Sequence, residues 1–292
     1  MGNLKEIRNR ISSVNSTQKI TSAMKLVSAA KLRRAQTSII NLRPYANKLN
    51  EILGNLSDTL EESGDIPLFE NREPEKVIMV VITSNRGLCG SFNSNVIKEV
   101  HRVIHEKYRS NVMNGTLKFI CIGKKGYEQI AKHYDVIYYN ESLLETPAFT
   151  ELAVVAENLI LDFTEKKVDR VEIVYNEFVN PATQRVTASQ YLPVKNLNPA
   201  ENQKVKTDYL FEPSKNELLE ELIPKILKTQ MYKSLIDSIA SEHGARMTSM
   251  AKATDNANEM LKELKLKYNN ARQSSITNEL LEIISGANAL DS

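Results

Sequence analysis

The sequence predicts an α/β protein whose first and last helices pair into a long antiparallel two-helix coiled coil. Three observations predict it: heptad-spaced apolar residues at the start of the chain, the same spacing near its end, and alternating strand and helix patterns between them. We expect a helix over 1–62, an α/β domain over 75–195, a linker over 196–213 and a helix over 214–290. The segments that begin and end the chain then form one rod.

The first helix carries a sustained apolar seam. Of the sixteen positions reached by alternating steps of four and three from Ile7 to Leu60, twelve are apolar, which is typical of a coiled coil. Pro44 lies inside this pattern and predicts a kink or a short break. The four polar seam positions are consecutive, and such a stretch either fixes register or meets another partner. They are Gln18, Thr21, Lys25 and Ser28.

The last helix carries the matching seam but is longer. At about 1.5 Å per residue, a helix of roughly 75 residues spans about 110 Å, and about 20 residues at its carboxy-terminal end have no partner in the first helix. This tip is too apolar to remain in water, so we expect another protein to surround it. Pro224 predicts a second kink. The seam residues are Met250, Thr254, Ala257, Leu261, Leu264, Tyr268, Ala271 and Ser275, and the tip contains Ile276, Leu280, Leu281, Ile283, Ile284, Ala287 and Leu290.

Charge is nearly balanced overall, with Lys+Arg 38 against Asp+Glu 36, but it is unevenly distributed. Up to Arg43 the chain has nine basic residues and the single acid Glu6. A basic helix of this kind also fits a nucleic-acid-binding or scaffold coiled coil, which is the alternative interpretation. The basic residues are Lys5, Arg8, Arg10, Lys19, Lys25, Lys31, Arg33, Arg34 and Arg43.

Two cysteines, Cys89 and Cys121, form no CxxC pair, which favours a reducing compartment. There is no apolar run of about 18 residues and no signal-peptide core, so we expect a soluble chain.

The middle of the chain alternates strands and helices. The run VIMVVI at 77–82 is typical of a strand buried on both faces of a parallel sheet. The pattern indicates a Rossmann-like, doubly wound sheet of about five strands, the last of them antiparallel. The further expected elements are helix 94–108, strand 117–122, helix 126–133, strand 136–139, helix 150–166, strand 170–178 and strand 185–194.

The loop after the first strand lacks the chemistry of a nucleotide site. Gly87 and Gly90 stand where a phosphate cradle belongs, yet there is neither GxGxxG nor a P-loop, so a tight turn needing two glycines is favoured. Cys89 has no neighbouring histidine and is expected to be buried and inert. His101 and His105 have a zinc-compatible spacing but no third ligand. The sequence therefore predicts no catalytic, cofactor-binding or metal-binding residue, and we expect the chain itself not to be an enzyme.

Three long motifs resemble the gamma subunit of F-type ATP synthases. They are LKEIRNRISSVNSTQKITSAMKLVSAAKLRRAQ at the start, TSNRGLCGSFN inside the chain, and SEHGARMTSMAKATDNANEMLKELKLKYNNARQSSITNELLEIISGANAL at the end. The resemblance covers essentially the whole chain, with the motifs in the same order and spacing. It implies a non-catalytic rotor shaft, turning inside a ring of three alpha and three beta subunits and coupling proton flow to ATP synthesis or hydrolysis.

The resemblance also implies partners and site residues. The partners are the alpha, beta and epsilon subunits and the c-ring, with one copy of this chain per complex and no cofactor. The lack of a targeting extension favours a bacterial protein, peripheral on the cytoplasmic face of the inner membrane. Beta-subunit contact and torque are expected at Met24, Lys25, Arg246, Arg272, Gln273, Thr277 and Glu279, and the apolar bearing at Ile276, Leu280, Ile283, Ile284 and Leu290.

Overall fold

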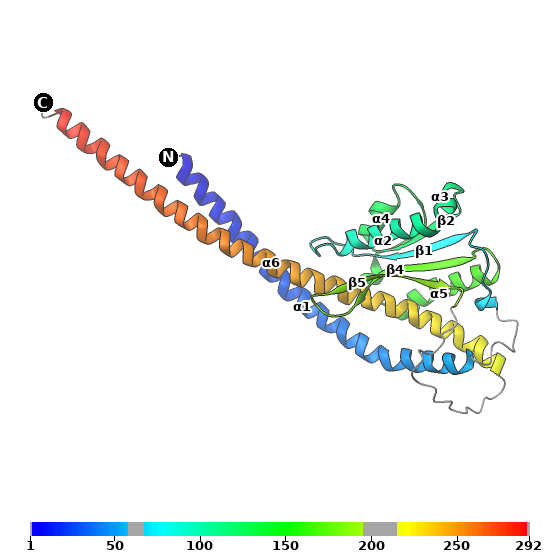
Figure 1. The fold of residues 1–292 in the computed structure, drawn as a ribbon. Helices are drawn as coiled ribbons and strands as arrows, with labels where there is room; N and C mark the ends of the chain where they lie inside the picture. Colours follow the sequence, from blue (N-terminus) through cyan, green and yellow to red (C-terminus); the bar gives the residue numbers. More distant parts are fainter. Residues whose placement is uncertain (1, 58–66, 195–214, 291–292) are drawn as a thin grey trace. The chain divides into compact units, whose positions relative to one another are not determined.

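A computed structural model describes residues 2–57, 67–194 and 215–290 (Figure 1). Two helices dominate it: α1 spans Gly2–Ser57 and α6 spans Lys215–Leu290. The chain divides into two compact units, one formed by residues 1–28 with 247–292 and the other by residues 29–246. The predicted pair of long terminal helices is confirmed.

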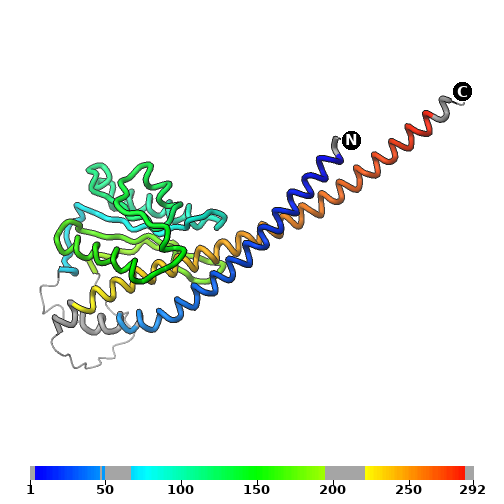
Figure 2. The backbone as a smooth tube through the Cα atoms, turned by 180° about the vertical axis from the view of Figure 1, so that it is seen from behind, coloured from blue at the N-terminus to red at the C-terminus, as the bar shows by residue number. Residues whose placement is uncertain are grey.

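The first unit is a two-helix coiled coil. Its two segments run side by side, with both chain ends at the same end of the unit (Figures 1 and 2). Four seam residues of this unit are buried: Thr21, Ser28, Met250 and Ala257. Lys25 is exposed, and the other seam residues are half-buried. The hydroxyl oxygens of Thr21 and Thr254 lie 2.8 Å apart across the seam. The heptad spacing therefore located the buried stripe on both helices.

Neither proline interrupts its helix. Pro44 lies within α1 and Pro224 within α6, and the helical assignment continues through both. The short break that was one of the two expected outcomes at Pro44 is therefore absent. Proline removes one backbone donor, and a long helix held by tertiary packing along its apolar stripe tolerates that loss.

The second unit contains a five-stranded sheet in the order β3-β2-β1-β4-β5. Strand β1 pairs in parallel with β2 and β4, β2 pairs in parallel with β3, and β5 is antiparallel to β4. The predicted mixed sheet is confirmed. The strands are β1 (Val77–Ile82), β2 (Leu117–Ile122), β3 (Asp135–Asn140), β4 (Arg170–Phe178) and β5 (Gln184–Leu192).

Helices cover both faces of this sheet (Figure 1). Helices α2 (Phe92–Lys107), α3 (Arg109–Met113) and α4 (Lys124–Ile130) lie on one face, and α5 (Phe149–Thr164) lies on the other with the beginning of α6. Phe149 stacks edge-on against Tyr232, and Lys228 pairs with Glu157, so α5 and α6 are in contact. The two crossovers β1–α2–β2 and β2–α4–β3 run in the same direction along the sheet, which places their helices together.

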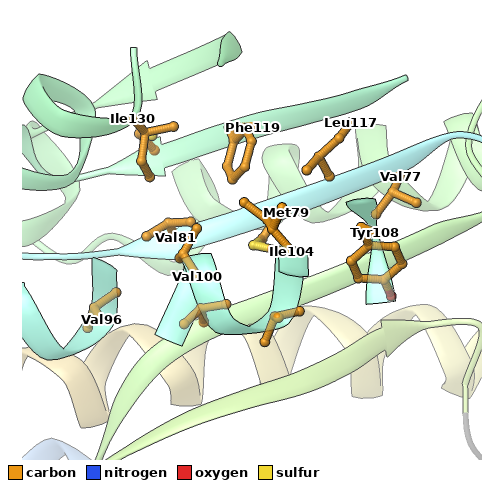
Figure 3. Close-up of a cluster of buried hydrophobic side chains, with 13 residues drawn as sticks. Val77, Met79, Val81, Val96, Val100, Ile104, Tyr108, Leu117, Phe119 and Ile130 are labelled. Atoms are coloured by element: carbon orange, nitrogen blue, oxygen red, sulfur yellow. The ribbon is translucent and has the colours of Figure 1, made fainter. Parts of the chain in front are cut away.

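A core cluster of buried side chains lies between the sheet and α2 (Figure 3). Met79, Val81 and Phe119 project from the strands toward Val100 and Ile104 on the helix. Alternate residues of a strand point to opposite faces, so β1, buried at all six positions, supports both layers.

Element boundaries agree closely with the pattern. Strands β1, β2 and β4 begin and end at the predicted residues, whereas the helices are offset by one to three residues at most ends. Among the described residues, the unpredicted short elements are α3 and the 3-10 turns Pro67–Phe69 and Ser142–Leu144.

Candidate partner-binding surfaces

The end of α6 leaves its apolar residues uncovered. Ser275 is the last half-buried residue of the seam, and residues 276–286 are all exposed. The exposed fractions are 47% for Ile276, 54% for Leu280, 57% for Leu281, 68% for Ile283 and 55% for Ile284. Leu290 belongs to α6, but its side chain lies outside the described residues. An apolar stretch of this length without a partner in its own unit marks an interaction surface.

The four polar residues expected beside the tip are also exposed. Arg272, Gln273, Thr277 and Glu279 follow one another along about two turns of α6. The Thr277 hydroxyl donates to the backbone oxygen of Gln273 at 2.9 Å, and the Ser275 hydroxyl donates to Glu279 at 3.5 Å. The Arg272 guanidinium and the Gln273 amide lie on the surface, where they can bind an acidic loop.

Met24 and Lys25 lie on α1 beside further exposed apolar side chains. Met24 is half-buried and Lys25 is exposed. Leu26 and Val27 are 69% and 57% exposed. All nine basic residues up to Arg43 are exposed as well, so this helix offers a surface that is both basic and apolar.

Arg246, by contrast, is directed into its own unit. Its side chain is 9% exposed. Nη1 donates to Oε1 of Glu242 at 2.6 Å, and Nη2 donates to the carbonyl oxygens of Arg86 at 3.0 Å and Gly87 at 3.3 Å. Nε donates to the Gly87 oxygen at 3.3 Å. The fork geometry of a guanidinium suits two adjacent carbonyls, so Arg246 fastens α6 to the loop after β1.

Glu242 and His243, which lie beside Arg246, have pKa values shifted by burial and by the charge of Arg246. Burial raises the pKa of Glu242, although the charge and hydrogen bond of Arg246 act in the opposite direction. Burial, with the positive charges of Arg246 and Lys31, lowers the pKa of His243 to about 4. His243 is therefore neutral at pH 7, and its Nδ1 lies 3.4 Å from Nη1 of Arg246.

The loop that Arg246 holds is a compact polar turn. Asn93 accepts hydrogen bonds from the backbone N–H and the hydroxyl of Ser84, at 2.9 and 3.0 Å. Gly90 has φ +61°, which glycine adopts without strain, and Leu88 has φ +62° and is 62% exposed. Gly87 has no positive φ, and a Cβ there would meet nothing within 4 Å. The expectation that the turn needs two glycines is therefore wrong at Gly87, whose contribution is its carbonyl oxygen.

Cys89 is buried in the place where this fold class often binds phosphate. It packs with Phe92 and Ala245, so side chains of α2 and α6 fill the space after β1. Burial raises the pKa of the Cys89 thiol, and it raises that of Cys121 to about 12. Both thiols are thus protonated and unreactive at neutral pH, as predicted for Cys89. Among the described residues, no cluster of three or more His, Cys, Asp or Glu side chains could hold a metal ion.

Gly244 has a packing role that the sequence pattern did not reveal. A Cβ at this position would lie 3.0 Å from the carbonyl oxygen of Pro181, in the turn between β4 and β5. The glycine thus allows α6 to approach this turn closely.

A buried carboxyl group, Asp237, faces a cavity of about 270 Å³ between α1, β4 and α6. It is 3% exposed. Burial raises its pKa to about 6, with Glu177 adding to the shift and Lys233 and Arg43 opposing it.

None of the described helices has an apolar stretch suited to crossing a membrane. The exposed apolar and basic side chains of α1 and α6 make these surfaces the candidate sites, and protein partners are the ligands that their chemistry fits.

Known proteins match this chain along nearly its full length. A family model described as ATP synthase matches residues 3–290. The ATP synthase gamma chain of Cytophaga hutchinsonii is 51% identical over 294 residues, and that of Flavobacterium johnsoniae is 52% identical over 292 residues, each comparison covering 100% of both chains. The gamma chain of Geobacter sp. is 44% identical and covers 99% of both.

Solved structures share the fold. A chain from the Euglena gracilis mitochondrial ATP synthase (OSCP/F1/c-ring, rotational state 3) has a TM-score of 0.71 and 23% identity, covering 99% of this chain and 95% of that one. A chain from the central stalk and c-ring of the Tetrahymena thermophila mitochondrial enzyme has a TM-score of 0.57 and 22% identity, covering 80% and 99%. The matches do not favour a nucleic-acid-binding or scaffold protein. With half of its residues identical to those gamma chains along the entire length, the chain belongs to the ATP synthase gamma chain family.

Proposed function

We propose that this chain is the central-stalk rotor of a bacterial ATP synthase. It turns inside a hexamer of alpha and beta subunits and couples ion flow to ATP synthesis or hydrolysis at the beta subunits, without binding nucleotide itself. Its other partners are the epsilon subunit and the c-ring, and it is peripheral, on the cytoplasmic face of the inner membrane. The observation that carries the proposal is the uncovered apolar end of α6, because a shaft that turns in a sleeve requires such a surface.

The apolar tip acts as the bearing. Ile276, Leu280, Ile283 and Ile284 present a surface that slides without breaking directional bonds, since apolar contact is non-directional. Leu290 is proposed to extend the same surface.

The polar residues of the tip transmit torque. Arg272 and Gln273 offer several N–H donors that form and release bonds with an acidic beta-subunit loop as the shaft turns, and Thr277 and Glu279 follow on the next turn. Met24 and Lys25 meet an acidic segment of a beta subunit through long-range charge attraction, which tolerates rotation.

Arg246 contributes indirectly. Because its guanidinium is buried and bound to the carbonyl oxygens of Arg86 and Gly87, it positions the loop that displays Arg86 and Leu88 at the surface. It is thus a positioning residue for partner contact. We further propose that the segments 1–62, 75–195, 196–213 and 214–290 are the functional divisions: coil, α/β foot, linker and coil.

Reconstitution with alpha, beta, epsilon and membrane-sector subunits tests the proposal. Deleting about the last dozen residues should leave a folded chain but weaken assembly or coupled ATP synthesis. Unchanged coupled synthesis would count against the bearing. Arg272→Ala with Gln273→Ala should lower ATPase turnover of the complex without unfolding the shaft, and undiminished turnover would remove the torque assignment.

A further inference from the structure

A second uncovered apolar surface lies on the α/β unit. It is a groove of about 390 Å³ between α5 and strands β1, β2 and β3. Its apolar lining comes from both sides: Ile78, Ile120 and Ile137 from the strands, and Val154, Val155 and Leu159 from the helix.

The helix side of the groove is formed by α5, which carries apolar residues on two sides. Leu152, Ala156 and Phe163 form the buried side that packs on the sheet. Val154 and Leu161, seven residues apart, are 54% and 56% exposed. Residues seven apart lie on one side of a helix, and a surface helix normally carries polar residues on its outward side. The outward stripe of α5 is therefore suited to a partner.

The strand side of the groove is shaped by an irregularity in β3. Phe119 pairs with Val136, but the next residue of β2, Ile120, pairs with Tyr138, so Ile137 is an extra residue. Such a bulge redirects side chains, and here the consecutive residues Ile137 and Tyr138 both line the groove. Ile137 is 45% exposed. Bulges commonly lie beside functional sites.

The charge of the lining has one sign. Glu151 and Asp162 line the groove, and none of the described lining residues is a lysine or an arginine. Glu151 accepts hydrogen bonds from two neutral groups, the Asn140 amide at 3.0 Å and the Ser142 hydroxyl at 3.5 Å, neither of which neutralises its charge. The Nζ atom of Lys167 lies 3.8 Å from Oδ1 of Asp162 but only 2.5 Å from Oε2 of Glu165, so Lys167 pairs mainly with Glu165. An occupant is therefore expected to carry positive charge.

We propose that this groove binds an α-helix of a partner protein, one whose apolar side is flanked by lysine or arginine. The apolar lining takes the i, i+3/i+4 and i+7 anchors of such a helix, and the two carboxylates pair with its basic flanks. This inference rests on the groove alone and stands independently of the rotor assignment.

The probe is a fluorescein-labelled peptide of about 14 residues, or four helical turns, with leucines on one side and lysines on the other. Its binding to the full-length chain is measured by fluorescence anisotropy at low and at physiological salt. Val154→Lys and Ile137→Lys place a repelling charge in the groove at exposed positions. Met113→Lys is the matched control, because Met113 is 82% exposed on α3, on the other face of the sheet.

We expect the groove variants to bind the lysine peptide at least about tenfold more weakly, which corresponds to at least about 1.4 kcal/mol. Met113→Lys should leave the affinity for the peptide unchanged. Glu151→Gln with Asp162→Asn should weaken binding several-fold and reduce its salt dependence. Circular dichroism verifies the fold of every variant. Equal binding by Val154→Lys, Ile137→Lys and Met113→Lys, or equal binding of a peptide with glutamate in place of lysine, would overturn the proposal.

Discussion

The hydroxyl groups of Thr21 and Thr254 meet at 2.8 Å across the seam of the coiled coil, 233 residues apart in the chain. Each also contacts its own helix: the Thr254 hydroxyl lies 2.8 Å from the oxygen of Met250, and that of Thr21 lies 3.1 Å from the oxygen of Gln18. A polar pair within an apolar seam favours one alignment of two helices over its slipped alternatives.

Replacing either threonine by valine should therefore weaken the coil. Thr21→Val or Thr254→Val is expected to lower the free energy of unfolding by about 1 kcal/mol, the net value of one hydrogen bond. The double variant should lose less than the sum, since valines pack against each other. Urea unfolding followed by circular dichroism gives the coupling energy, and strictly additive losses would mean that the hydroxyls do not interact.

The lowered pKa of His243 predicts a loss of stability in acid. The unfolded histidine titrates at 6.5 and the folded one at about 4, so the folded state binds fewer protons between these values. Its contribution is complete above pH 6.5 and falls as pH drops toward 4, by at most about 3 kcal/mol. His243→Gln should flatten this part of the stability profile. A profile identical to that of the parent chain would exclude His243 as the cause.

Asp237 predicts the opposite slope. Its pKa rises from 3.8 to about 6, so the folded state binds more protons between these values and stability falls as pH rises through them. Asp237→Asn removes the buried charge and should raise the free energy of unfolding at pH 7 by about 1–3 kcal/mol, with little change at pH 4. Thermal unfolding at both pH values measures this. A gain of equal size at pH 4 would point to packing instead of charge.

Gly244 and Gly286 provide a matched pair on one helix. Alanine is normally favoured over glycine in a helix by about 1 kcal/mol. At Gly244 the added Cβ would press on Pro181, so Gly244→Ala should destabilise the α/β unit, whereas at Gly286 it meets nothing within 4 Å and should be neutral or stabilising. Differential scanning calorimetry distinguishes the two. A stabilised Gly244→Ala would show that the turn yields at little cost.

Local patterns predicted the elements well because each carries its own period. The heptad spacing identified the seam stripes of both helices, including Thr254 and Tyr268. The run VIMVVI predicted both ends of β1 correctly. Contacts between distant segments were inaccessible to such patterns. The family resemblance implied a beta-subunit contact for Arg246, and Glu242, four residues before it, was the available sign of an inward ion pair. Nothing local indicates that Gly244 meets Pro181 or that β3 carries a bulge.

The most direct test of the rotor assignment is single-molecule rotation. Cys89 and Cys121 are 1% and 0% exposed, so a thiol-reactive probe should label Met113→Cys, at a position 82% exposed, in preference to them. The labelled chain is assembled with alpha and beta subunits, and the hexamer is fixed to a surface and supplied with ATP. We expect unidirectional rotation of the probe that slows when Arg272 and Gln273 are replaced by alanine. A complex that assembles and hydrolyses ATP while the probe stays fixed would contradict it.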